Sequence, residues 1–419
     1  MMERFFAELQ AGELKQQLPL LREKLERAGT LRVVPNAHGI YAASASQAPG
    51  SATGYQNAWL RDNAMVAHSV WQSGNAESAL RTSRGLGKFL ATQTKRFEAI
   101  LRKPARKEDV QERPHIRFDV ETLRENDEKW PHAQNDALGM TLWLRFRLAN
   151  EAGYPLTGEE RELYAYFPKY FRAIEYWNDR DSGAWEEARK VNSSSVGAVM
   201  AGLFAMADYL WKGGRIAGVT RKMLQELIDK GERTLSKQLP LEAPPERDAD
   251  GALLFLLYPL ELVKRPDLKH LIVSLVRARL AGKIGIRRYV GDSYFCQDYH
   301  EWFSPEVRSA DFSDRVGLRD AFLRPGCEAQ WCLFDPLLSV IYGQQFLQQP
   351  ERAELLELQL LHLNRAIAQI NERGECPELY FLKNGTYVWN EHTPLAWAQA
   401  NLSLAIGQLE KSVKASRER

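Results

Sequence analysis

Hydrophobic residues along this chain recur mainly at helical spacing, so the sequence predicts a protein built largely from helices. Strand-like alternation of polar and apolar residues is rare, which excludes a parallel α/β sheet. The stretches with helical periodicity are 2–27, 58–73, 75–98, 133–152, 157–178, 193–211, 218–237, 265–280, 327–347, 350–372 and 393–413, with a shorter one at 253–262.

Several of these stretches begin with residues that start helices. Thr157 with Glu160 has the spacing of a capping box, in which each side chain bonds the backbone N–H of the other. Thr393 before Pro394 predicts an N-cap followed by proline at the first helical position. Two further residues are predicted to cap helices through side-chain oxygens, Asn75 and Ser193.

The predicted helices are of two kinds, and the difference indicates how they pack. Segments 137–149 and 331–343 are apolar nearly all round, as helices covered on every side are. Segment 351–370 has one charged face, which is typical of an outer layer. No sequence repeat of fixed period stands out, which argues against tetratricopeptide or ankyrin arrays. We therefore predict an all-α fold, an (α/α)6 barrel, formed by one domain over 1–419 with an N-terminal helical segment at 1–30.

The charge balance bears on the class of partner. The chain has 419 residues, 44% hydrophobic and 26% charged, with 56 basic against 54 acidic residues and a net charge of +2. A binder of nucleic acid or another polyanion usually has a stronger basic bias. A neutral partner such as a sugar fits better, and no nucleic acid is expected. Nothing in the sequence indicates an oligomeric state.

The termini and cysteines bear on the compartment. Charged residues occur throughout 1–17, which therefore lacks the apolar core of a signal peptide. No run of 18 apolar residues occurs, so no membrane span is expected. The cysteines show no CxxC spacing and predict free or buried thiols in a reducing, cytoplasmic setting, without a zinc site or any other cofactor; they are Cys296, Cys327, Cys332 and Cys376.

The segment Trp185-Glu186-Glu187 carries the strongest chemical signal. Adjacent carboxylates raise each other's pKa because the second negative charge forms beside the first, and an indole wall adds to this effect. A carboxylic acid that is protonated near neutral pH suits general acid catalysis on a glycosidic oxygen. The alternative is a solvated loop with two surface glutamates.

A second candidate carboxylate lies late in the chain, at Glu378 in the segment 376–380. We expect it in a loop between two helices, with its backbone restricted by Pro377. Hydrolysis of a glycoside with inversion needs an acid on the leaving oxygen and a base that activates water on the opposite face of the sugar. Two glutamates in loops between helices could meet across the mouth of a barrel.

The order of several motifs resembles that of a known family. The chain is similar, from about 40 to 410, to glycoside hydrolase family 15, the glucoamylases, and to the related amino-terminal region of the phosphorylase kinase alpha and beta subunits. The motifs that carry this resemblance are 58–63 (AWLRDN), 130–137 (WPHAQNDA), 185–187 (WEE), 285–289 (GIRRY) with 292–294 (DSY), and 377–380 (PELY).

The resemblance implies roles for the carboxylates and their neighbours. Glu186 corresponds to the general acid and Glu378 to the general base for water. Glu187 corresponds to a glutamate that contacts substrate, and Arg61 with Asp62 to a pair that binds hydroxyls of the terminal sugar. The alternative for this Arg–Asp pair is a structural ion pair.

The resemblance also assigns further residues to the substrate site. Arg288 matches an arginine near the substrate, and Trp59, Trp185 and Tyr289 are expected to form walls against the apolar faces of a pyranose. Asp136 is expected to contact substrate, with a helix-capping or network role as the alternative. For the two tryptophans the alternative is core packing.

The predicted function is an inverting, exo-acting hydrolase of terminal α-glucosidic bonds, acting on a neutral α-glucan or oligosaccharide. The Pro-Glu-Leu-Tyr form of the last motif is closer to the phosphorylase kinase relatives. A non-catalytic carbohydrate-binding or regulatory module is therefore the competing hypothesis, and a trehalase-like hydrolase is a third. Two retained glutamates favour the enzyme, because a binding module does not need the second carboxylate.

Overall fold

A closed ring of helical segments forms the centre of the computed structural model, which describes residues 5–44 and 54–416. Each segment of the ring contacts the next, and the last contacts the first. In ring order they are α2 (Leu60–Gln72), α5 (Asn135–Glu151), α8 (Ser193–Trp211), the 3-10 helix η4 (Gly251–Leu256), α13 (Phe334–Gln348) and α15 (Ala396–Ala415).

An outer layer covers this ring, with partners set by the chain order. Each outer segment packs on the inner segment or outer neighbour beside it. The outer layer comprises α1 (Leu14–Ala28), α3 (Ala76–Thr92), α4 (Thr94–Arg102), α6 (Gly158–Tyr164), α7 (Tyr166–Ile174), α9 (Arg221–Gln238), α10 (Pro266–Leu280) and α14 (Ala353–Ala368). The prediction of an (α/α)6 barrel is confirmed.

Some details of the predicted helices are wrong. The helix expected over 2–27 begins only at Leu14, because the turn around Gly12 precedes it; residues 1–4 lie outside the described residues. The helix expected over 253–262 is the 3-10 helix η4. The stretches 75–98 and 157–178 each form two helices, α3 with α4 and α6 with α7.

The capping predictions have mixed outcomes. The capping box of Thr157 with Glu160 is present, and the Asn75 side chain accepts a hydrogen bond from the Ser78 N–H. Ser193 is the first residue of α8 and not its cap. The cap predicted at Thr393 is wrong, because α15 begins at Ala396 and the Thr393 hydroxyl donates to the Asn390 carbonyl instead.

The contact between α5 and α8 is unusually close because it is lined by glycine. A Cβ atom at Gly139 would stand 2.5 Å from the carbonyl carbon of Ala198 and from the amide nitrogen of Val199. A Cβ atom at Gly202 would stand 2.8 Å from the Gly139 carbonyl oxygen. Backbone atoms cannot yield as a flexible side chain can, so glycine at these positions sets the distance between two inner helices.

Replacing Gly139 with alanine is expected to lower the free energy of unfolding by about 3 kcal/mol, since overpacking against backbone outweighs the gain in helix propensity. Gly407→Ala in α15 is the matched control, because a Cβ there meets no atom within 4 Å. Urea unfolding of both variants measures the effect. Equal stability of the Gly139 variant and the wild type would contradict the packing argument.

Helix α8 is the one helix within 5–44 and 54–416 that is long and apolar enough to cross a membrane, and 78% of its most apolar window is buried. Its composition follows from its place in the inner ring, where neighbouring helices and the outer layer cover it. It belongs to one continuous cluster of buried apolar side chains that extends from Leu9 to Leu409.

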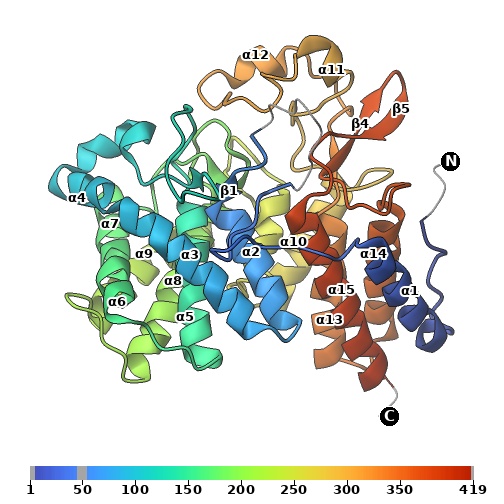
Figure 1. The fold of residues 1–419 in the computed structure, drawn as a ribbon, viewed down its shortest axis with the longest axis horizontal. Helices are drawn as coiled ribbons and strands as arrows, with labels where there is room; N and C mark the ends of the chain where they lie inside the picture. Colours follow the sequence, from blue (N-terminus) through green and yellow to red (C-terminus); the bar gives the residue numbers. More distant parts are fainter. Residues whose placement is uncertain (1–4, 45–53, 417–419) are drawn as a thin grey trace.

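Short strands and turns gather at one end of the barrel and support the site (Figure 1). Strand β1 (Ala58–Trp59) pairs antiparallel with β2 (Arg117–Phe118). Strand β4 (Leu379–Lys383) lies between β3 (Gln330–Trp331) and β5 (Thr386–Trp389) in an antiparallel sheet. The same end carries 3-10 helices η1 (Pro104–Glu108), η2 (Val110–Glu112) and η3 (Gly183–Trp185), and short helices α11 (Tyr299–Trp302) and α12 (Val316–Asp320).

Candidate functional site

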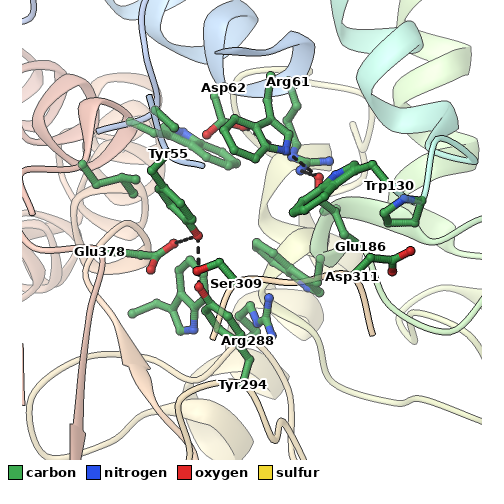
Figure 2. A pocket seen from close by; sticks show the side chains of 18 of the residues that line it. Tyr55, Arg61, Asp62, Trp130, Glu186, Arg288, Tyr294, Ser309, Asp311 and Glu378 are labelled. Atoms are coloured by element: carbon green, nitrogen blue, oxygen red, sulfur yellow. Dashed lines mark hydrogen bonds and ion pairs between the residues drawn. The ribbon is translucent and has the colours of Figure 1, made fainter. Parts of the chain in front are cut away.

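A cavity opens at the end of the barrel that carries the strands (Figure 2). Most of the predicted site residues line it: Trp59, Arg61, Asp62, Trp185, Glu186, Arg288 and Glu378. Aromatic side chains outside the predicted set complete its walls: Tyr55, Trp130, Tyr294, Phe312, Trp331 and Trp397. Segments far apart in the sequence thus contribute to one polar and aromatic cavity.

Glu186 faces the cavity from the turn after η3, in a left-handed backbone conformation with φ of 61°. The Trp59 indole N–H donates to its Oε1 at 2.8 Å, and the Gln134 amide donates to the same oxygen at 3.1 Å. Within 5–44 and 54–416, no group donates a hydrogen bond to its Oε2. Because Oε1 accepts both of these hydrogen bonds, Oε2 is the oxygen left to contact a ligand.

Arg61 is fixed from behind by buried acceptors. Its Nη1 donates to Gln134 Oε1 at 2.9 Å and to Asp136 Oδ2 at 3.0 Å, while Nη2 lies 3.6 Å from Glu186. Asp136 is fully buried and is not among the residues that line the cavity. Asp136 therefore orients Arg61 from the layer behind, which matches the network alternative and not the expected direct contact.

Asp62 does line the cavity, at the start of α2. Burial raises the pKa of its carboxyl to about 6, and Arg61 opposes that shift from 3.9 Å. A carboxylate beside a fixed guanidinium presents an acceptor and a donor to the same cavity. Such a pair can bind two hydroxyls of one sugar ring.

Glu187 points away from Glu186 into a cluster of cations. Arg288 Nη2 donates to its Oε1 at 3.2 Å, Arg319 Nη2 donates to the same oxygen, and the Tyr289 hydroxyl donates to Oε2. Burial favours the neutral acid, but Arg319 and Arg288 outweigh it and lower the pKa of Glu187 to about 2. The expectation that the adjacent glutamates raise each other's pKa is thus wrong for Glu187.

Two predicted residues lie behind the cavity surface. Glu187 and Tyr289 do not line the cavity, because each is directed at the other. Tyr289 is therefore a support for Glu187 and not the wall that was expected. Trp185 does form a wall, and its indole N–H donates to the buried Asp250 at 2.7 Å.

Glu378 lies directly before β4, in the connection between α14 and α15 where a loop was expected, and the β4–β5 hairpin that follows it in that connection was not predicted. Its side chain is 2% exposed, and it accepts hydrogen bonds from the Tyr55 hydroxyl at 2.7 Å and from the Asn390 amide at 2.6 Å. Burial raises its pKa to about 8, against the opposing effect of these two donors. Figure 2 shows Glu378 and Glu186 on opposite sides of the cavity.

Tyr55 is held in place by its own contacts. Its ring stacks on His392 with centroids 3.6 Å apart, and its hydroxyl lies 3.1 Å from the Tyr294 hydroxyl. Burial lowers the pKa of His392 to about 3, so the stacked imidazole is neutral. Burial also raises the pKa of Tyr55 well above its usual value. Tyr55 therefore stays a donor to Glu378 near neutral pH.

If Glu378 acts as a base, kcat/KM for a sugar substrate should rise with pH along a limb whose midpoint lies at about pH 8. The reason is that the carboxyl carries a proton below its raised pKa and cannot accept another. Initial rates at low substrate concentration from pH 5 to pH 9 measure this limb. A limb centred below about pH 6 would contradict it.

Replacing Tyr55 with phenylalanine is expected to move the same limb to higher pH. The lost hydrogen bond stabilises the charged form of Glu378, so its removal raises the pKa further. The variant's kcat/KM profile should be compared with that of Tyr41→Phe, a buried tyrosine away from the cavity. A reduced rate with no displacement of the limb would contradict this role.

Sequence reasoning missed several residues of the cavity. Tyr55, Tyr294 and Arg319 reach it from loops or short helices, and Asn390 reaches Glu378 from the end of β5. Trp130 and Tyr294 belong to the motifs 130–137 and 292–294, and their place in those motifs could have indicated that they line the cavity. The charged segment 99–130 also contributes to this end of the barrel, because 113–118 is buried and Trp130 lines the cavity.

No group of three or more His, Cys, Asp or Glu side chains within 5–44 and 54–416 is arranged to hold a metal ion. The cysteines are all free, and Cys296, Cys332 and Cys376 are buried. The prediction of free or buried thiols is confirmed. The cavity presents carboxyl groups, guanidinium groups, phenols and other aromatic side chains.

A barrel of paired helices with a carboxylate-bearing, aromatic cavity at one end defines a glycosidase-type fold. The sequence profile of glycosyl hydrolases family 15 matches residues 25–237, so the chain belongs to that family. The resemblance inferred from the ordered motifs is confirmed.

Curated relatives include the probable phosphorylase b kinase regulatory subunit alpha of Caenorhabditis elegans, 25% identical over 387 residues, with 82% of this chain and 30% of that protein covered. The liver isoform of the same subunit from Oryctolagus cuniculus is 24% identical over 271 residues, covering 57% of this chain and 21% of that protein. The chain thus spans less than a third of the length of these relatives.

Solved structures share the fold over nearly the whole chain. A glycosidase variant in complex with glucose superposes with a TM-score of 0.70 at 20% identity, covering 96% of this chain and 99% of that one. The glucoamylase from Saccharomycopsis fibuligera superposes with a TM-score of 0.57 at 13% identity, covering 98% and 99%. At these identities the likeness establishes the fold alone.

Proposed function

We propose that this protein is an inverting, exo-acting hydrolase of terminal α-glucosidic bonds. Glu186 protonates the leaving oxygen, and Glu378 removes a proton from the attacking water. The observation that carries this proposal is the placement of two carboxyl groups on opposite sides of one aromatic cavity, each fixed by hydrogen bonds. Inversion needs room for water between them, so their separation is expected to be about 6.5–9.5 Å.

The other polar groups support a neutral sugar as the substrate. Arg61 and Asp62 offer a donor and an acceptor side by side in the same wall of the cavity. Tryptophan and tyrosine rings around them offer flat apolar surfaces to a pyranose ring. The lining carries charges of both signs, with Arg61, Arg288 and Arg319 beside carboxyl groups, so the cavity does not select an ionic substrate by net charge.

Hydrolysis of a panel of α-glucans and α-linked glucobioses by the full chain tests this proposal. The wild type is expected to release glucose from at least one member, and the Glu186→Gln, Glu378→Gln double variant from none. The panel includes trehalose, which separates a trehalase-like enzyme from a glucoamylase-like one. Absence of glucose release from every substrate, or equal release by the double variant, would overturn the proposal.

A second candidate is a carbohydrate-binding regulatory module. It is favoured by the curated relatives, whose names describe regulatory subunits of phosphorylase b kinase. The two candidates differ in one measurable property, because a module of this kind binds an α-glucobiose without cleaving it. We also propose a cytoplasmic location, which the sparse, unpaired cysteines support.

A further inference from the structure

The cavity is small for a substrate site. It encloses about 90 Å³, whereas pockets that bind small molecules usually have volumes of about 300–1,000 Å³. A part of its lining must therefore move outward before a sugar enters. Most of the lining belongs to helices and strands of the barrel, so the part that moves is expected to be a segment that is packed less firmly.

Residues 301–326, which include α12, contain few buried side chains. Among them only Phe312 and Arg319 are buried, and both line the cavity. Figure 1 shows α11 and α12 beyond the end of the barrel, outside the ring of inner helices. A segment with so little buried apolar surface opens at a lower free energy than packed helices do. This segment is therefore the part of the lining that moves most readily.

The stretch 308–314 of this segment, here called the strap, is attached at one end on the side of Glu378. The Ser309 hydroxyl lies 3.0 Å from His392 Nε2. His392 in turn stacks on Tyr55, which donates a hydrogen bond to Glu378. The first attachment of the strap thus lies beside the candidate base.

The other end of the strap is attached on the side of Glu186. Lys129 forms an ion pair with Asp314 and directly precedes Trp130, a wall of the cavity. The Trp130 ring packs edge-on against Trp59, which donates a hydrogen bond to Glu186. Both members of the ion pair are 57% exposed, whereas Trp130 is 8% exposed. The ion pair therefore lies on the solvent side of this wall.

Between its two attachments the strap crosses the cavity. The strap residues that line the cavity are Ser309, Ala310, Asp311 and Phe312. An ion pair between exposed side chains changes a population by about fivefold at most, and salt screens it. The attachment at His392 is more buried than the one at Lys129. The strap is therefore expected to open at the Lys129–Asp314 end.

We propose that the strap closes the cavity, with the Lys129–Asp314 ion pair as its latch, and that it favours short α-linked substrates over long glucan chains. This inference rests on the proposed function. A short substrate allows the latch to reform after it has entered. A longer chain must leave the cavity across the strap, so it holds the latch open for as long as it is bound.

Trypsin cleavage after the exposed Arg315 tests the latch independently of any activity. Lys129→Gln removes the cation of the latch, and mass spectrometry follows this one cleavage at equal trypsin concentration. Proteolysis tracks the population of the open form, so the variant should be cut about two- to fivefold faster than the wild type. Glu226→Gln is the matched control, because it breaks a similarly exposed ion pair, with Arg172, away from the cavity.

Substrate preference tests the effect of the strap on specificity. The kcat/KM values are compared for a disaccharide and a heptasaccharide of one linkage, maltose with maltoheptaose and isomaltose with isomaltoheptaose. In the series that the wild type hydrolyses, the disaccharide should be the better substrate. Lys129→Gln should raise the heptasaccharide-to-disaccharide ratio about two- to fivefold. The charge-exchanged double variant, Lys129→Asp with Asp314→Lys, should restore the wild-type ratio.

Several results would overturn the proposal. They are equal cleavage after Arg315 in Lys129→Gln and the wild type, equally fast cleavage in the Glu226→Gln control, a wild-type preference for the heptasaccharide, or a ratio that Lys129→Gln leaves unchanged or the exchanged pair does not restore. A wild type that hydrolyses no sugar would refute the proposed function, while the cleavage rates after Arg315 would still confirm or overturn the latch.

Discussion

Replacing Glu378 with glutamine is expected to lower kcat for an α-glucobiose by about 10²–10⁴-fold, the usual contribution of a general base. Glutamine keeps the size of the side chain and the hydrogen bond from Tyr55, but it cannot accept a proton from water. Steady-state rates of glucose release measure the loss. The effect should lie in kcat, because the hydroxyl-binding groups of the cavity remain.

The matched control for that variant is Glu391→Gln. Glu391 lies near the same hairpin but pairs with His300 at 3.0 Å and Arg308 at 3.4 Å, and it does not line the cavity. Its replacement should change kcat by only a few-fold. Equal losses in the two variants would indicate damage to the hairpin and not loss of a base.

Replacing Glu186 with glutamine is expected to reduce glucose release from an α-glucobiose by a similar factor, about 10²–10⁴-fold. A sugar alkoxide leaves poorly without a proton, and glutamine has none to give. On α-glucosyl fluoride the loss should be much smaller, because fluoride leaves without strong acid assistance. Rates of the variant on both substrates, each relative to the wild type, test the acid assignment.

Glu187→Gln separates this acid role from general damage to the loop. Glu187 balances Arg288 and Arg319, so its replacement should weaken hydrolysis of both substrates through the lost ion pairs. A Glu186 variant that loses the same factor on the fluoride as on the glucobiose would show that Glu186 is not the acid.

The inner ring of the barrel could be predicted because its helices have a distinctive composition. Helices α5 and α13 are apolar nearly all round, and this composition alone predicts that other helices cover them on every side. The segment at 251–256 was misjudged because a short apolar run has the same periodicity in an α-helix and in a 3-10 helix. Strand β4 was not predicted for a different reason: Leu379–Lys383 is too short to show the alternation of polar and apolar residues that is typical of a strand.

The candidate site was predictable where residues belong to compact motifs. Trp59, Arg61 and Asp62 are neighbours in the sequence, and so are Trp185 and Glu186, so each group could be located as a unit. Tyr55 could not be linked to Glu378, because 323 positions separate them and only the folded ring brings them together.

Asp136 and Tyr289 show a different limit of the sequence. Each occurs in a motif, yet a linear sequence does not tell whether a side chain faces the cavity or supports another residue from behind. Asp136 accepts a hydrogen bond from Arg61, and Tyr289 donates one to Glu187. Both residues therefore support another side chain and do not line the cavity themselves. Arg319 belongs to no motif, and only the position of α12 over the cavity identifies it.

The most direct test of the proposed mechanism is the configuration of the first product. Proton NMR during hydrolysis of α-glucosyl fluoride by the wild type, recorded before mutarotation, reports the anomer that the enzyme releases, because its only sugar product is the glucose formed at the attacked carbon. Attack of water activated by Glu378 on the face opposite Glu186 requires β-glucose as the initial product. Initial release of α-glucose would contradict an inverting pair formed by these two glutamates.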